Sequence, residues 1–238
     1  MKKQVFLVLT VLSILLFTAC NSLSKEEIIS EVEENAKEVH SYKVEVDFED
    51  EYPRDEEVEK SSSKTEAFID LKANQGFIDH TNQHGILYQY YFEGDDVYSD
   101  QRGRGNWLLE DDWTEEVVHT IARSDYNAIL NYYLPIIKEQ ENVDMEHKEN
   151  SYIISYSGGD EEGAELLKLY EGRELEEDTD KAIEMILEID ENTMFIQSFQ
   201  FRLEEELDEG TMVFQEHRIF SEINEIENIE VPEGVVSY

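Results

Sequence analysis

The sequence predicts an α+β domain in which one antiparallel β-sheet is covered on its apolar face by short helices. Two groups of segments, within residues 42–109 and 143–223, alternate apolar and polar residues with a period of two, which is typical of half-buried antiparallel strands. Apolar residues at helical spacing precede the first group and separate it from the second. Because a sheet with one apolar face needs helices to cover it, we assign residues 24–238 to a single domain.

The composition supports a folded but very acidic chain. With 40% hydrophobic and 11% aromatic residues it can fill a core, while 58 acidic residues against 19 basic ones give a net charge of −39. This charge argues against nucleic-acid binding, because contacts with phosphates require a basic surface. It also disfavours electrostatic docking on anionic lipid. We therefore expect any link to a membrane to be covalent or apolar.

The first twenty residues provide such a link. Lys2 and Lys3 precede an apolar run at residues 5–17, which is too short for a comfortable transmembrane helix. The run ends in Phe-Thr-Ala-Cys at residues 17–20. Apart from Phe in the place of the usual Leu, this end resembles the lipobox of bacterial lipoprotein signal peptides.

The resemblance implies a lipid-anchored protein on the outer face of the cytoplasmic membrane. Residues 1–19 would be the signal peptide, and residues 20–23 a short tether whose Cys20 carries a thioether-linked diacylglycerol. The mature chain would then hold 17 basic and 58 acidic residues, a net charge of −41. The alternatives are an ordinary secretory signal with an accidental cysteine, or an uncleaved anchor. Cys20 is the only cysteine, so the chain forms no internal disulfide.

The domain begins with a helix and a strand. Ser24 and Glu27 form a capping box, and apolar residues recur at helical spacing from Ile28 to Val39, so a helix is predicted to end near His40. Strict alternation predicts a strand over residues 42–49. Residues 50–63, rich in acids and serines, are predicted to be a polar loop or a long hairpin tip.

A meander and two helices are predicted next. The strands lie at residues 67–71, 77–80, 86–92, 97–99 and 107–109, with a tight turn at Gly94-Asp95 and a loop at residues 103–105. Asp112 and Asp125 are suited to cap helices over residues 113–121 and 126–134. Pro135 is expected to kink or end the second helix.

The last part of the chain is predicted to be mostly strand. Residues 143–147 and 152–156 are expected to pair through a turn at residues 149–151, and Gly158-Gly159 breaks the chain. Ten of the residues 160–180 are acidic, which predicts one modest helix and a solvated tail. Strands at residues 183–189, 195–203 and 212–223 follow, and residues 226–232 close the domain.

Several of these segments together resemble a group of Gram-positive surface lipoproteins of unknown function. They are Ser-Tyr-Lys-Val at 41–44, Gly-Asp-Asp-Val-Tyr at 94–98 followed by Trp107, Leu-Glu-Ile-Asp-Glu-Asn-Thr at 187–193, Phe-Ser-Glu-Ile-Asn at 220–224 and Ile-Glu-Val-Pro at 229–232. The group is similar in fold to the LolA, LppX and LprG lipoprotein carriers. This resemblance, over most of residues 24–236, implies an incomplete, strongly curved barrel with helices on its concave side. In those carriers the hollow between sheet and helices holds acyl chains.

The sequence shows no convincing catalytic or metal-binding constellation. Its six histidines form no HExxH pair, and His80 and His84 straddle a turn-like stretch, which disfavours a zinc site. We find no G-x-S-x-G elbow, no glycine-rich phosphate loop and no EF-hand pattern among the acids. We therefore expect a protein that is not an enzyme and uses no metal or cofactor.

Aromatic residues are the remaining candidates for a binding site. Tyr88, Tyr90, Phe92 and Trp107 lie close together in the sequence, and Phe199 and Phe201 could face them from the second group of strands. They either line a hollow for an apolar ligand or fill the core as ordinary strand residues, because aromatic residues favour pleated surfaces in any case.

Two functions follow as hypotheses. The first is a non-enzymatic lipoprotein that is held on the cell membrane by its diacylglycerol and binds a lipid or another apolar ligand between sheet and helices. The second is a structural or signalling accessory protein that engages an envelope protein through its acidic surface, with the acids of residues 50–57 and 160–180 as the contact.

Overall fold

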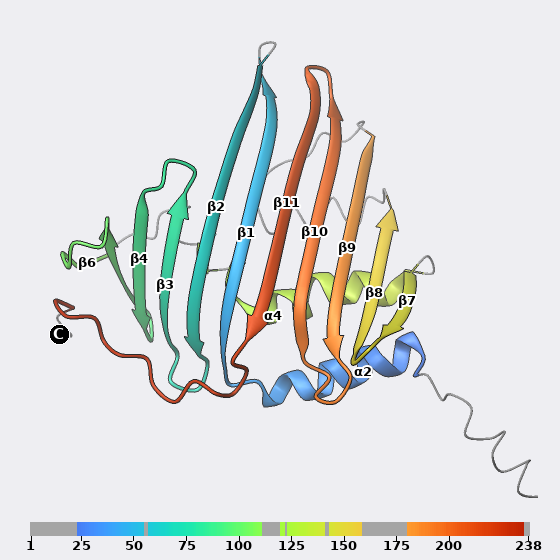
Figure 1. Cartoon of the computed structure of the whole chain (residues 1–238), viewed down its shortest axis with the longest axis horizontal. Coiled ribbons are helices and arrows are strands. Elements are labelled where there is room, and N and C mark those ends of the chain that lie inside the picture. The colour runs from blue at the N-terminus through green and yellow to red at the C-terminus, as the bar shows by residue number, and fades with distance from the viewer. Residues whose placement is uncertain are drawn as a thin grey trace, which may run out of the picture.

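The computed structural model describes residues 23–54, 57–110, 120–121, 123–140, 143–158 and 180–235. Within these ranges, eleven strands form one open antiparallel sheet with helices on one face (Figure 1). The strand order is β6-β5-β4-β3-β2-β1-β11-β10-β9-β8-β7. The predicted fold class is therefore confirmed. Three predicted features lie outside the described residues: the signal segment with Cys20, the helix at 113–121 except for residues 120 and 121, and the acidic stretch at 160–180 except for Asp180.

Two meanders make up the sheet. The first consists of β1 (Ser41–Arg54), β2 (Glu57–Asp70), β3 (Gln75–Asn82), β4 (Leu87–Glu93), β5 (Asp96–Gln101) and β6 (Leu108–Leu109). The second consists of β7 (Val143–Lys148), β8 (Ser151–Gly158), β9 (Lys181–Asp190), β10 (Ile196–Leu207) and β11 (Gly210–Ser221). The pairing of β1 with β11, from Lys43 opposite Ser221 to Glu51 opposite Val213, joins the meanders in the middle of the sheet.

The acidic segment after residue 49 forms a long hairpin and not a loop. The ladder between β1 and β2 continues as far as Arg54 opposite Glu57. Polar side chains are tolerated there because opposite charges lie side by side, as in the ion pair of Glu51 with Lys60 and that of Arg54 with Glu59, 3.6 Å apart. Of the two predictions for residues 50–63, the hairpin is thus correct.

The N-terminal helix follows its capping signal. In α2 (Lys25–Asn35) the backbone N–H of Glu27 donates to Ser24 Oγ at 3.3 Å, and the N–H of Ser24 donates to Glu27 Oε2 at 2.8 Å. A short 3₁₀ turn, η1 (Ala36–Glu38), leads into β1. Ile28, Ile29 and Val32 are fully buried, so the apolar stripe of the helix packs on the core.

The second helical segment continues through its proline. Asp125 caps α4 (Tyr126–Ala128) by accepting a hydrogen bond from the N–H of Asn127 at 2.9 Å. A π turn, η2 (Ile129–Tyr133), and then α5 (Leu134–Glu139) follow without a break. Pro135 does not end the segment, because it lies in the first turn of α5, where its missing N–H is tolerated.

The two faces of the sheet differ. The helices α2 and α4–α5 lie behind the lower part of the sheet in Figure 1, on the side that we call the inner face. The inner face carries the main core, with Tyr42, Val44, Leu187 and Phe199 among its buried members. The other side, the outer face, is largely polar. Residues 222–235 cross it, and Ile229 packs there with Tyr91 and Tyr98.

Candidate functional site

The register of the strands arranges the inner face in rows. Val46 lies opposite both Thr65 and Arg218, Thr65 opposite His80, and His80 opposite Tyr88. On the other side, Arg218 lies opposite Phe199, and Phe199 opposite Leu187. One row of side chains therefore crosses the inner face from β4 to β9.

Five of the six predicted binding residues share the inner face, and one does not. Tyr88, Tyr90 and Phe92 alternate along β4 and face the same way as Phe199 and Phe201 of β10, with four strands between the two sets. Trp107 belongs instead to the outer-face cluster, where its ring centroid lies 6.3 Å from that of Phe77.

The two phenylalanines are already in contact with a helix. The ring centroid of Tyr133, in η2, lies 4.5 Å from that of Phe199 and 5.6 Å from that of Phe201. Phe199 and Phe201 are 0% and 2% exposed, respectively. At β10 these rings serve as core, whereas on β4 Tyr88 and Phe92 are only partly buried.

A charged cluster interrupts the apolar inner face. Arg218, which is 0% exposed, donates through Nε to Glu216 and through Nη1 to the carbonyl of Asp125 at 3.4 Å. The second carboxylate oxygen of Glu216 lies 3.6 Å from Nε of Arg123. The guanidinium of Arg123 lies over the ring of Phe48 at 3.9 Å. Two arginines from different elements thus share one buried glutamate. Sequence reasoning missed them, although alternation along residues 212–220 places Glu216 and Arg218 on the apolar side.

His80 is a further polar member of the row of side chains that crosses the inner face. Its Nδ1 is joined to Thr65 Oγ1 by a hydrogen bond of 2.9 Å, and the side chain is buried. Burial, together with the positive charge of Arg123, lowers the pKa of His80 to about 4. His80 is therefore neutral at physiological pH. His84, its partner in the disfavoured zinc site, is exposed in the turn after β3.

Two tyrosines fasten the second helical segment to the sheet. The hydroxyl of Tyr42 donates to the carbonyl of Ser124 and accepts from the N–H of Tyr126, each at 3.0 Å. The hydroxyl of Tyr126 in turn accepts from the N–H of Ile196 at 2.9 Å. Burial raises the pKa of both hydroxyls far above the ordinary value, so both stay protonated.

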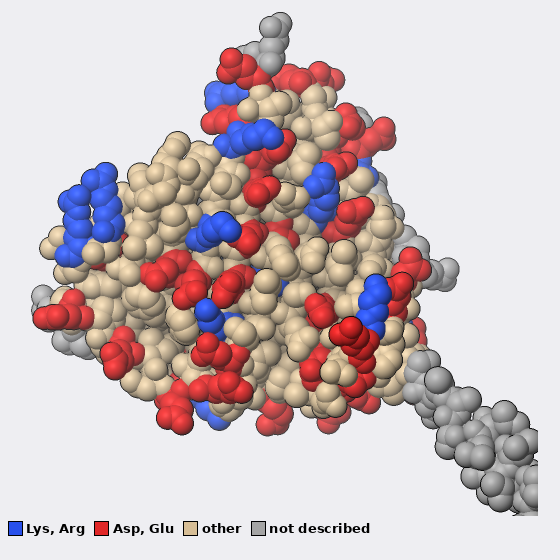
Figure 2. Space-filling view, in the orientation of Figure 1, with Lys and Arg blue, Asp and Glu red and all other residues tan. Residues whose placement is uncertain are grey.

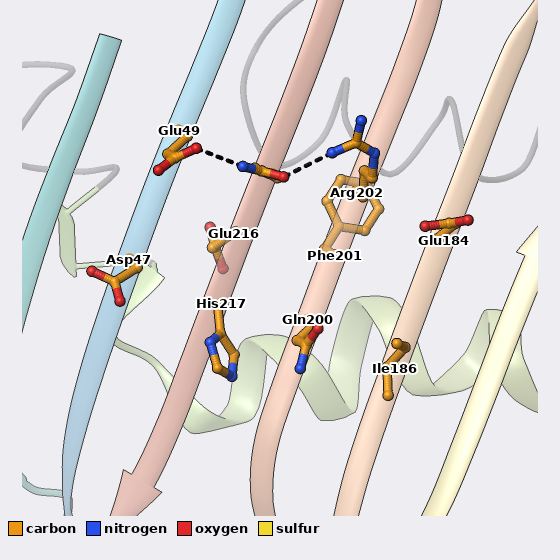
Figure 3. A pocket seen from close by; sticks show the side chains of 10 residues that line it. Asp47, Glu49, Glu184, Ile186, Gln200, Phe201, Arg202, Glu216 and His217 are labelled. Atoms are coloured by element: carbon orange, nitrogen blue, oxygen red, sulfur yellow. Dashed lines mark hydrogen bonds between the residues drawn. The ribbon is translucent and has the colours of Figure 1, made fainter.

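The outer face has a shallow hollow of about 280 Å³ over β1, β11, β10 and β9 (Figure 3). Gln215 bridges Glu49 and Arg202 across it, donating to Glu49 at 2.6 Å and accepting from Arg202 at 2.8 Å. Asp47, Glu184, Ile186, Gln200 and His217 are also in its lining. The acids of the lining thus outnumber its one arginine.

In the described parts of the chain, no group of three or more His, Cys, Asp or Glu side chains is arranged to hold a metal ion. Among the helices of the same ranges, none combines the length and the apolar character needed to cross a bilayer.

Comparison with known proteins identifies a family model and distant structural likenesses. The model described as "Family of unknown function (DUF6612)" matches residues 24–237, whereas no curated protein sequence matches. Lipoprotein LppX of Mycobacterium tuberculosis is 11% identical with a TM-score of 0.46, covering 87% of this chain and 100% of its own. A LolA superfamily protein of Nitrosomonas europaea is 10% identical with a TM-score of 0.29, covering 84% and 92%. A DUF1329 family protein of Desulfovibrio piger is 10% identical with a TM-score of 0.27, covering 82% and 90%. At such scores these likenesses do not bear on function.

Proposed function

The chain belongs to the DUF6612 family, whose function is unknown, and we propose that it is a non-enzymatic, extracytoplasmic lipoprotein that binds a lipid or another apolar ligand on its inner face. The proposal rests on the width of that face. Eleven strands at a spacing of about 4.8 Å span roughly 48 Å. At about 1.5 Å per residue, α2 is only about 16 Å long and the segment from α4 to α5 about 21 Å.

The described helices are thus much shorter than the inner face is wide. They lie behind its lower part in Figure 1, whereas Phe214, Leu203 and Ile183, each at most 2% exposed, extend the apolar layer toward the upper ends of β11, β10 and β9. Toward the other edge of the sheet, Tyr88 and Phe92 continue the apolar layer of the inner face along β4. A broad apolar layer with aromatic side chains is the kind of surface on which acyl chains bind without polar recognition.

Native mass spectrometry of the full-length protein purified from bacterial membranes tests this function. We expect a noncovalently bound apolar molecule on the wild-type protein and less of it on Tyr88→Ala. The matched control is Phe68→Ala, which truncates a partly buried aromatic ring on the outer face. Protein that is repeatedly recovered without a ligand, or equal losses in the two variants, would contradict the proposal.

The lipid anchor needs its own test. We propose that Cys20 carries a diacylglycerol, on the strength of its place at the end of the apolar run. Intact-mass analysis of membrane-extracted protein is expected to show a chain that begins at Cys20 and carries the added lipid. Cys20→Ser should abolish both the cleavage and the added mass. A chain cleaved elsewhere, with an unmodified cysteine, would count against the anchor but not against ligand binding.

The hollow of the outer face favours a second candidate, an envelope protein partner. Asp47, Glu49 and Glu184 give it an anionic lining, to which a basic protein surface is complementary. Crosslinking in intact cells would test it. One dominant partner should be captured by the wild-type chain and lost in Glu49→Lys/Glu184→Lys, and unchanged capture would refute it.

A further inference from the structure

One corner of the sheet differs in charge from the rest of this acidic molecule. Residues 81–92 and 101–109 contain no aspartate or glutamate, in a chain with 58 acidic residues. The two segments are neighbours in space, because Tyr88 pairs with Gln101 and the N–H of Arg102 donates to the carbonyl of Leu87 at 2.7 Å. In Figure 2 the upper left of the molecule shows blue and tan side chains in this region, whereas red side chains are spread over most of the remaining face. We call residues 81–92 and 101–109 the acid-free corner.

The acid-free corner presents cations beside exposed apolar side chains. Arg102 and Arg104 are exposed, and neither has an ion-pair partner among the described residues. Leu108 and Leu109 are 68% and 44% exposed, the former being the largest exposure among the large apolar residues of the described chain. Trp107 precedes them and is partly buried. This set combines two exposed guanidinium groups with exposed leucine side chains.

The backbone holds these side chains outward. Arg102, Gly103 and Gly105 adopt positive φ angles of 77°, 57° and 72°, which bend the loop sharply after β5. The N–H of Gly105 donates to the carboxylate of Asp100 at 2.6 Å, and Asp100 is only 2% exposed. Asp100, the acid that precedes this loop in the sequence, is therefore held beneath it, whereas Arg102 and Arg104 are exposed.

The net charge of the whole chain disfavours docking on anionic lipid, but this corner differs from the rest, and we propose that it docks on the surface of an anionic phospholipid bilayer. Guanidinium groups bind phosphate oxygens in bidentate fashion, and tryptophan and leucine side chains favour the boundary between headgroups and acyl chains. The acids on the rest of the molecule are repelled by anionic lipid, which favours the orientation in which the acid-free corner faces the bilayer. Charge interactions fade within about 8 Å at physiological ionic strength, so a bilayer at the corner meets Arg102 and Arg104 while acids farther away than this are screened.

The position of the corner gives the docking a geometric consequence. The first turn of α2, next to the proposed N-terminal anchor, and strand β6 lie at opposite ends of the long axis of the molecule (Figure 1). A chain held at both ends would lie with its long axis along the bilayer. This second contact goes beyond the proposed function, since the corner would dock whether or not the inner face holds a ligand.

Fluorescence of Trp107 tests the docking. The full-length chain with Trp113→Phe, in which Trp107 is the only remaining tryptophan, is anchored through its N-terminal segment in phosphatidylcholine vesicles with or without phosphatidylglycerol. Brominated acyl chains in the vesicles quench nearby indole rings. We expect strong quenching of Trp107 that increases with the phosphatidylglycerol content and decreases as salt is added.

Variants separate docking from mere anchoring. At about 1 kcal/mol for each basic side chain near an anionic surface, Arg102→Gln/Arg104→Gln should weaken docking about 30-fold. The control Lys37→Gln/Lys72→Gln removes two exposed cations elsewhere and should leave quenching unchanged. Leu108→Ser/Leu109→Ser should reduce quenching in both kinds of vesicle.

Three outcomes would overturn the proposal. The first is the absence of quenching of Trp107 in the Trp113→Phe chain, and the second is equal quenching in the arginine and lysine variants. The third is a shielding of Trp107 from the brominated lipid that disappears on dilution, because it would show that a second copy of the chain covers the corner. Circular dichroism of every variant checks that the fold is retained. Because no ligand is involved in this assay, its failure is distinct from a failure of ligand binding on the inner face.

Discussion

The hydroxyl of Tyr42 is expected to contribute more to stability than any exposed hydroxyl of the sheet. Tyr42→Phe keeps the ring, whose centroid lies 5.6 Å from that of Phe220, and removes one oxygen atom. That oxygen serves both the carbonyl of Ser124 and the N–H of Tyr126, each 3.0 Å away. Ser124 and Tyr126 are 1% and 0% exposed, so water does not replace the lost partner.

The magnitude follows from the two backbone groups that the change leaves unpaired. An unsatisfied buried donor or acceptor costs about 1–3 kcal/mol, so the loss in the free energy of unfolding for two such groups should be about 2–6 kcal/mol. Tyr88→Phe is the matched control, because its hydroxyl accepts one exposed hydrogen bond from Gln101 at 3.3 Å. We expect the control to cost less than about 0.5 kcal/mol.

Equilibrium urea unfolding at neutral pH, followed by circular dichroism, measures both variants against the wild type. The slope with urea should be the same for all three, because the surface exposed on unfolding does not change. Ordinary surface substitutions change the free energy of unfolding by roughly 0.5 kcal/mol or less. If the values for Tyr42→Phe and Tyr88→Phe differed by no more than about this amount, the hydroxyl of Tyr42 would not be what fastens the helical segment to the sheet.

Three further changes test the inner face by the same unfolding measurement. The pKa of His80 is about 4 in the fold against an ordinary value of 6.5, so the unfolded chain binds its proton first as the pH falls. Between neutral pH and about pH 4, the wild type should therefore lose about 3 kcal/mol more than His80→Gln, and parallel curves would disprove this. Glu216→Gln leaves the guanidinium groups of Arg123 and Arg218 without their shared carboxylate and should cost about 3 kcal/mol or more, whereas a neutral effect would mean that the cluster is balanced by other groups. In Gly76→Ala the new methyl carbon would lie 2.2 Å from the ring of the residue opposite. About 1–3 kcal/mol should be lost, and an unchanged midpoint would show that this ring moves aside freely.

Local signals in the sequence account for much of the fold. The capping box of Ser24 and Glu27 marks the start of α2 because both of its hydrogen bonds form within one turn. Alternation over residues 42–49 predicts β1, since a strand with one buried face repeats every two residues. The turns at Gly94 and Gly210 use positive φ angles of 63° and 137° that other residues seldom adopt.

What depends on distant parts of the chain could not be predicted. A period of two shows that Tyr88, Tyr90 and Phe92 share a face, but the intervening loop sets Trp107 on the other one. The π turn at residues 129–133 shows no local signal except the proline that follows it. The pairing of β1 with β11 joins segments that no turn connects, so its register depends on the assembled core and not on any single motif.

The pairing of β1 with β11 also has a consequence for the partly folded chain. Strand β1 ends at Arg54 and its partner β11 begins at Gly210, so β1 is synthesised well before the strand with which it pairs. Until then, one side of β1 is an open edge with unpaired backbone groups, which invites pairing with other chains. The edge carries Lys43, Glu45 and Asp47 at alternate positions, and like-charged copies of so acidic a chain repel one another. The negative charge of the chain would thus act before folding is complete, because it keeps the first meander from aggregating until β11 pairs with β1.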